Sequence, residues 1–249
     1  MLFELSFFLL LGLTFGSFFQ VIGVRVPLGE PIAWSRSVCP RCKKILRARD
    51  LFPVLSYLIT FGKCRYCAVR ISPGYPLAEI VTASLFVLIY VRYQVSPETI
   101  MAIIVISLVI IVTITDLHYM RIPNSILAFF ACLLIFVRIF LHPFDPWWDP
   151  FMAALLSFSV LFVLMNMSGG GLGGGDVKLF AVLGLAFGLL DLLLVFFLST
   201  LVGTAIGIGS RILARLKPGQ PFPFAPSIAL AVIIVVMAGD WLWHWYSII

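Results

Sequence analysis

Two aspartates stand at the ends of long apolar runs, where their chemistry would act at the edge of a membrane. Asp116 closes one apolar run, and Asp176 follows a glycine cluster, Gly171–Gly175, and opens another. A charge there is costly without a use, and glycines let backbone pass close to it. Two neighbouring carboxylates cannot readily ionise together, so one can accept a proton from water while the other donates one. The pair predicts an aspartyl protease within or beside the bilayer.

A purely structural explanation of the same residues stays open at this point. Asp116 could pair with Arg121, and Asp176 could cap a helix that begins at Val177. Lys178 could bias the charge of Asp176, or it could only anchor its segment at the interface. Glu79, just inside another apolar run, should face the protein interior or a cavity, which makes it a secondary site candidate.

Four cysteines form two CxxC pairs, Cys39 with Cys42 and Cys64 with Cys67, separated by 21 residues. This spacing is close to that of zinc ribbons, in which each pair supplies two ligands to a tetrahedral Zn²⁺. A redox CxxC would be expected beside a βαβ pattern, and none is visible. Because all four thiolates would be used, the expected zinc is structural and leaves no position for a reacting water.

The bulk composition places these residues in a polytopic membrane protein. The 249 residues are 62% hydrophobic and 11% charged, with a mean hydropathy of +1.12, whereas soluble domains are about a quarter charged. Because a bilayer span needs about 20 apolar residues, an all-α fold with about eight transmembrane helices is expected. The expected spans are 2–24, 76–93, 99–117, 123–142, 150–168, 176–188, 190–213 and 226–246.

The expected organisation has three parts. Residues 1–24 form a first transmembrane helix, residues 25–75 a zinc-binding loop, and residues 76–249 a seven-helix peptidase domain. Ten of the 17 Lys and Arg residues lie between positions 25 and 70. The positive-inside rule puts this loop in the cytoplasm, where thiols stay reduced. It also puts both termini outside and both aspartates on the cytoplasmic face.

The net charge of +6 could suggest a nucleic-acid partner. Its concentration in one membrane-flanking loop is better explained by topology, so no nucleic acid is expected. Attraction of the basic loop to anionic lipid is the expected role of this charge.

The order of motifs along nearly the whole chain resembles the type IV prepilin peptidases, which are membrane aspartyl proteases with a GxGD motif. The motifs are G-S-F-F-Q-V at 16–21, the two cysteine pairs, Y-P-L-A-E at 75–79, Asp116 before I-P-N at 122–124, G-G-G-D at 173–176, and P-F-A-P at 223–226. A lone GxGD motif would be weak evidence, whereas both aspartate motifs and four cysteines in this order are specific.

The resemblance implies an enzyme of the bacterial cytoplasmic membrane that cuts leaders from type IV prepilins or pseudopilins at the cytoplasmic face. It implies that Asp116 and Asp176 are catalytic and that the four cysteines hold the metal. Separately from the resemblance, Gly173, Gly175, Lys178 and Glu79 are expected to support the site. Many members also methylate the new amino terminus with S-adenosylmethionine. No glycine-rich nucleotide-binding loop can be read from the loop at 25–75, so that cofactor is expected by resemblance only.

Two alternatives belong to other classes of protein. One is a different GxGD protease, such as a presenilin-like or preflagellin-type enzyme, against which the cysteine loop argues. The other is a proton-coupled transporter or an assembly scaffold whose acids are ion sites. The paired inverted segments common in transporters are not visible in the sequence.

Overall fold

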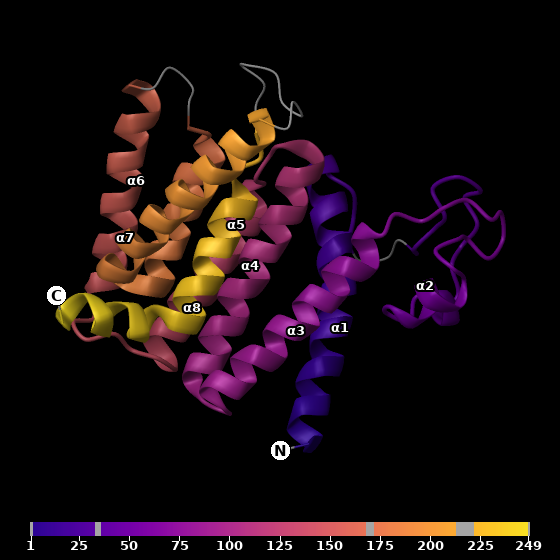
Figure 1. Ribbon diagram of the computed structural model, residues 1–249, viewed down its shortest axis with the longest axis horizontal. Helices are drawn as coiled ribbons and strands as arrows, with labels where there is room; N and C mark the ends of the chain where they lie inside the picture. Colours follow the sequence, from indigo (N-terminus) through magenta and orange to yellow (C-terminus); the bar gives the residue numbers. More distant parts are fainter. Residues whose placement is uncertain (1, 33–35, 168–171, 213–221, 249) are drawn as a thin grey trace. The chain divides into compact units, whose positions relative to one another are not determined.

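In the computed structural model, helices are the regular elements of the described residues, which are 2–32, 36–167, 172–212 and 222–248 (Figure 1). Gly171, at the start of the glycine cluster, lies outside them. The helices are α1 (Leu2–Arg25), α2 (Leu55–Ile59), α3 (Gly74–Tyr93), α4 (Pro97–Tyr119), α5 (Asn124–Phe140), α6 (Asp149–Met167), α7 (Gly174–Ile212) and α8 (Ala225–Ile248). Short 3₁₀ turns occur at Val26–Leu28 and Ala48–Asp50. The expected all-α class is confirmed.

Five of these helices are long and apolar enough to cross a membrane, namely α1, α3, α4, α6 and α7. The apolar part of α5 and the segment Ala225–Gly239 of α8 are shorter. A polytopic membrane protein is therefore confirmed, but the expected number of eight spans is not. The expected sixth and seventh spans both fall within α7, whose apolar stretch is 37 residues long.

The chain divides into two compact units, Met1–Gln94 and Val95–Ile249. In unit 1, α1 packs along α3. Gly12 and Gly16 make this possible, because a Cβ atom at either position would come within 2.7 Å of an α3 backbone atom. Such close backbone approach through small residues is typical of membrane helices. Near the N-terminus of α1, the Tyr90 hydroxyl of α3 donates to Glu4 at 2.7 Å.

In unit 2, α4 is the central helix, in contact with α5, α7 and α8. In its most apolar window 72% of the residues are buried, against 17% for α6. A helix that is apolar all round and buried belongs to a core, whereas α6 contacts chiefly α7 and leaves its other faces for lipid. Asp116 therefore lies on the most buried of the five candidate spans in the described residues.

Helix α7 consists of two helical segments that meet at Gly188, whose backbone is non-helical with φ 73°. A left-handed φ of this kind favours glycine. The freed backbone groups have side-chain partners: Arg138 donates to the carbonyls of Leu185 and Ala186, and Asp149 accepts from the Leu189 N–H at 3.1 Å. This break lies where the sequence predicted one segment to end and the next to begin.

Candidate active site and cysteine cluster

Asp116 occupies the last turn of α4. The helix starts at an N-cap serine, Ser96, and ends when Met120 adopts a left-handed conformation with φ 49°. The Met120 N–H donates to the Asp116 carbonyl at 2.8 Å, which closes that final turn. Pro123 then prevents the helix from continuing, and α5 begins at Asn124. The side chain of Asp116 is buried, with 8% exposed.

The Asp116 carboxylate points to the first residues of α8. Its Oδ2 accepts a hydrogen bond from the Ala225 N–H at 3.0 Å, and the Phe224 N–H is a second backbone donor to the same carboxylate. The first N–H groups of a helix have no partner within the helix and favour a negative charge. Two segments 109 positions apart are thereby joined at this carboxylate.

Asp176 lies in the first turn of α7. The Asp176 and Val177 N–H groups both donate to the Gly173 carbonyl, at 3.0 and 3.3 Å. Helix α7 thus begins at Gly174, so Asp176 is its third residue and not its N-cap. A Cβ atom at position 173 would lie 2.8 Å from Asp176 Oδ2. Only glycine at that position leaves room for the carboxylate in this orientation.

The start of α7 packs against the connection between α4 and α5. A Cβ atom at Gly175 would lie 3.0 Å from Ile122 Cβ. Lys178 Nζ donates to Asn124 Oδ1 at 2.9 Å, which ties α7 to the start of α5. Each of these contacts places the Asp176 turn beside the end of the helix that carries Asp116.

The two carboxylates belong to one site in unit 2. The Asp176 turn packs against the connection that directly follows the helix of Asp116, although the two aspartates are 60 positions apart in the chain. The described residues contain no ion pair between Asp116 and Arg121 that would account for Asp116 structurally. A pair of carboxylates, each with at least one backbone donor, has the groups that acid–base hydrolysis requires.

In unit 1, the four cysteines of the loop gather into one cluster. The sulfur atoms of Cys39, Cys42, Cys64 and Cys67 all lie within 4.8 Å of one another. The Cys39 and Cys67 Sγ atoms are 3.8 Å apart, and four sulfurs bound at about 2.3 Å to one tetrahedral zinc would be about 3.8 Å apart. The cluster could therefore hold a metal ion.

The two CxxC turns have the same backbone design. The Lys43 N–H donates to the Cys39 carbonyl and the Ala68 N–H to the Cys64 carbonyl, both at 2.9 Å. Lys43 and Ala68, each four residues after the first cysteine of its turn, both have positive φ, 55° and 54°. Such turns direct backbone N–H groups at the sulfurs: those of Cys42 and Arg41 lower the pKa of the Cys39 thiol to about 6, which favours the thiolate that binds metals.

Asp50 connects the segment between the cysteine pairs to the second pair. It accepts from Arg65 Nε at 2.8 Å, the Tyr66 hydroxyl at 2.9 Å and the Arg47 N–H at 3.1 Å. Burial opposes ionisation, but the Arg47, Tyr66 and Arg65 donors together hold the pKa of Asp50 below its usual value. The ionised carboxylate thus braces the residues that flank Cys64 and Cys67.

Comparison with known proteins identifies the family. Residues 10–93 match the bacterial peptidase A24 N-terminal domain, and residues 103–208 match the type IV leader peptidase family. The chain is 43% identical over 242 residues to a prepilin leader peptidase/N-methyltransferase of Bacillus subtilis, with 97% of each chain covered. It belongs to the type IV leader peptidase family. The protein of the same name from Aeromonas salmonicida is 34% identical over 85% of this chain and 74% of its own. No solved structure matches.

Glu79 was the secondary site candidate. Its carboxylate contacts the cysteine-containing loop and α1, which the sequence did not suggest. Its Oε2 accepts from the Val54 N–H at 2.8 Å, and Ser17 of α1 also donates to it. Val54 is the N-cap of α2, with a positive φ of 58° that is unfavourable for a β-branched residue. Glu79 thus anchors the loop to α1 and α3, so its described contacts are within unit 1.

Sequence reasoning missed the backbone donors at Phe224 and Ala225 and the partner of Lys178, Asn124. The P-F-A-P motif at 223–226 was one available signal, because prolines on both sides of a short segment fix the start of α8 and its free N–H groups. For Asn124, the only signal was its position directly after Pro123, at the first residue of a helix.

Proposed function

We propose that this protein is a membrane aspartyl endopeptidase that cleaves the leader peptide of type IV prepilins or pseudopilins. The observation that carries the proposal is the pair Asp116 and Asp176, on different helices of one unit, with the Asp176 turn packed against the connection that follows the Asp116 helix. Family membership and the names of the relatives, prepilin leader peptidase/N-methyltransferase, supply the substrate class.

The surroundings of the two carboxylates suggest a division of labour. Asp116 accepts from the Ala225 N–H at the start of α8, and such charge-assisted hydrogen bonds stabilise a carboxylate. A second carboxylate beside it is more stable with its proton. Asp116 would then accept a proton from the attacking water, while Asp176 donates its proton to the scissile carbonyl oxygen. When the tetrahedral intermediate collapses and its C–N bond breaks, Asp116 would give its proton to the leaving nitrogen and Asp176 would regain one from a hydroxyl of the intermediate, which leaves the new carboxyl group.

The test is cleavage of a co-expressed prepilin, followed by a gel shift. Asp116→Asn and Asp176→Asn should each abolish cleavage while the protein remains in the membrane, because an amide neither accepts nor donates the catalytic proton. Glu30→Gln, which changes an exposed acid of the loop, is the matched control and should cut normally. Full activity in either aspartate variant would show that the replaced aspartate is not catalytic and has only a structural role.

We propose further that Cys39, Cys42, Cys64 and Cys67 hold one structural Zn²⁺. The donor set fits, since four thiolates at these separations fill a tetrahedral site and leave no position for a reacting water. When bound, the ion would cross-link the two CxxC turns. Elemental analysis of the purified protein should find about one zinc per chain; its absence from protein prepared without chelators would refute the assignment.

Methylation of the new amino terminus is proposed from the relatives' names, with S-adenosylmethionine as the methyl donor. Incorporation of labelled methyl groups into cleaved substrate measures this activity directly. Cleavage without incorporation would leave the peptidase assignment intact and remove the second activity.

The charge pattern supports a cytoplasmic orientation of both sites. The ten basic residues between positions 25 and 70 should hold the loop inside, with both termini outside the bacterial cytoplasmic membrane. Protease cleavage sites inserted in the loop and at the two termini test this orientation, because a protease added outside intact cells cuts only the sites that face outward. A cleavage site in the loop that is cut from outside intact cells would reverse the topology.

A further inference from the structure

Five large apolar side chains in and around α2 are exposed, and together they form what is here named the α2 patch. Its members are Phe52, Leu55, Leu58, Ile59 and Phe61, with exposed fractions from 57% to 87%. Helix α2 has no buried residue, and its positions 55, 58 and 59 are neighbours on one helix face. Contiguous exposed apolar groups of this kind mark an interaction surface.

The start of α2 is bound to the second turn of α3. The Val54 N–H donates to Glu79 at 2.8 Å, and Glu79 lies five residues after Gly74, the first residue of α3. At 1.5 Å per residue this is about 7.5 Å along the helix axis. The helix α3 is one of the five that can cross a membrane. The N-terminal end of the α2 patch is therefore tied to the second turn of an apolar helix that is long enough to span a bilayer.

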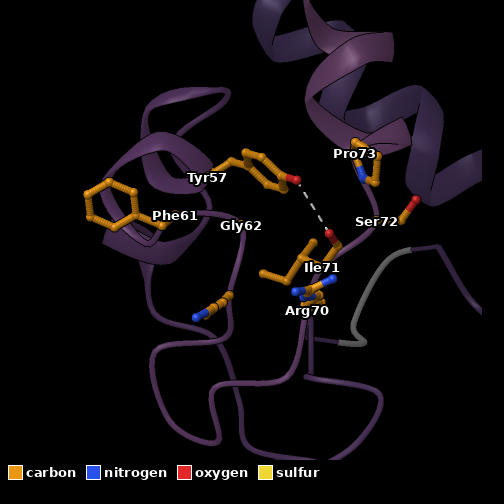
Figure 2. A pocket seen from close by; sticks show the side chains of 8 residues that line it. Tyr57, Phe61, Gly62, Arg70, Ile71, Ser72 and Pro73 are labelled. Atoms are coloured by element: carbon orange, nitrogen blue, oxygen red, sulfur yellow. Dashed lines mark hydrogen bonds between the residues drawn. The ribbon is translucent and has the colours of Figure 1, made fainter.

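The middle of α2 and the residues that follow it are held near the start of α3. The Tyr57 hydroxyl donates to the Ile71 carbonyl at 3.5 Å, and the Ile71 N–H donates to the Gly62 carbonyl at 2.7 Å. These residues line a cavity of about 640 Å³ together with Ser72 and Pro73, which directly precede α3. Figure 2 shows Tyr57 directed toward Ile71, and the exposed Phe61 also belongs to the lining of this cavity.

Two cations border the same surface. Lys63 and Arg70 are both exposed, line the cavity and face each other across an antiparallel bridge. In the described part of the chain, no carboxylate forms an ion pair with either. The stretch from 25 to 70 contains ten basic residues and only two acids, Glu30 and Asp50, and Asp50 is already bound to Arg65. An apolar surface bordered by free cations matches the interface of an anionic membrane.

We propose that the α2 patch inserts into the interface of a bilayer that contains anionic phospholipid, with Lys63 and Arg70 at the level of the headgroups. Interfacial segments bury their apolar side chains about 5–10 Å into the boundary between headgroups and acyl chains. The apolar helix of a protein partner would cover the patch equally well but would offer no charge to the two cations. Anionic lipid offers acyl chains to the apolar side chains of the patch and negatively charged headgroups to Lys63 and Arg70.

The test uses the full-length protein in nanodiscs. An environment-sensitive fluorescent amino acid replaces Phe61, or replaces exposed Lys43 on the first cysteine turn as the control. Lipids brominated along their acyl chains should quench the fluorophore at position 61 strongly and the one at position 43 little, in discs of mixed phosphatidylglycerol and phosphatidylethanolamine. Equal quenching at the two positions would overturn the proposal.

The effect of removing the two positive charges on quenching at position 61 distinguishes a lipid bilayer from a protein as the occupant of the patch. With the fluorophore at position 61, Lys63→Gln with Arg70→Gln should lower the ratio of inserted to detached loop about fivefold per residue. The control, Arg41→Gln with Lys43→Gln, removes the same charge from the first cysteine turn and should have a smaller effect. If position 61 escapes bromine quenching and instead cross-links to residues after Val95 or to a prepilin helix, a protein is the occupant and the lipid proposal fails.

Discussion

The aspartate site of unit 2 and the cysteine cluster of unit 1 are held in place by different means. Asp116 and Asp176 sit at the ends of long helices packed through a continuous apolar core around α4. In the described loop between α1 and α3, only Cys39, Gly62 and Cys64 are buried. A loop of this size lacks the core to fold alone, so its shape depends on side-chain ligands. The two sites should therefore fail under different perturbations.

The largest expected effect is on the loop. Cys39→Ser combined with Cys64→Ser removes the two buried cysteines, and should abolish zinc binding and expose the loop to limited proteolysis. The helices of unit 2 should stay resistant, because their stability comes from packing. Elemental analysis and proteolytic mapping measure both.

The chain provides its own control for this change. Cys132 is the fifth cysteine, exposed on α5 and remote in sequence from both pairs. Cys132→Ser should keep the metal and the protected loop. If the double variant retains bound zinc and an intact loop, ligands other than these cysteines hold the loop and the contrast between the units is wrong.

The second effect belongs to unit 2. Gly173→Ala places a methyl group 2.8 Å from Asp176 Oδ2, which forces the carboxylate out of its position. A misplacement of about 1 Å can cost about 100-fold in rate. Prepilin cleavage should fall by that order with zinc content unchanged.

Gly207→Ala is the matched control, because a Cβ atom there meets open space within the same helix α7. It should cut at the normal rate. Equal loss in both variants would mean that the effect comes from α7 in general. No loss in Gly173→Ala would mean that the position of the Asp176 carboxylate is not critical.

A smaller effect is expected at Asp50, which touches none of the sulfurs but braces the second cysteine pair. Asp50→Asn removes the charge that Arg65 and Tyr66 hold. Loss of a residue that orients metal ligands typically costs about 10–100-fold in metal affinity. Zinc competition with a chelator measures the change, and an unaltered affinity would show that the CxxC turns are rigid without it.

Asp50 should also make the stability of the loop depend on pH, with lower stability at acid pH. Because the pKa of Asp50 is lowered in the folded protein, its contribution to loop stability is full above the ordinary aspartate pKa of about 3.9 and is lost as the pH falls below that value. The difference between wild type and Asp50→Asn should therefore shrink toward acid pH. Protease resistance of the loop across that range measures it.

The helices could be predicted because membrane spans are encoded locally, by runs of apolar residues of sufficient length. The predicted 99–117 and 123–142 correspond to α4 and α5, and the break in α7 was also predicted. The short helix α2 was not predicted, since it depends on Glu79 capping from another helix. The aspartates could be named from their motifs, but the Ala225 N–H could not be assigned to Asp116, because that pairing arises only from packing between α4 and α8.

The smallest expected effect distinguishes two roles of Lys178, anchoring and electrostatic bias. Its hydrogen bond to Asn124 is exposed and worth about 1 kcal/mol. If Lys178 acts as an anchor, Lys178→Met and Asn124→Ala should each slow cleavage by less than about fivefold, with the same pH profile as the wild type. If Lys178 instead biases the charge of Asp176, only Lys178→Met should shift that profile. The contacts in the structure favour the first result, because the ammonium group donates to Asn124 of α5 and so ties the start of α7 to the start of α5.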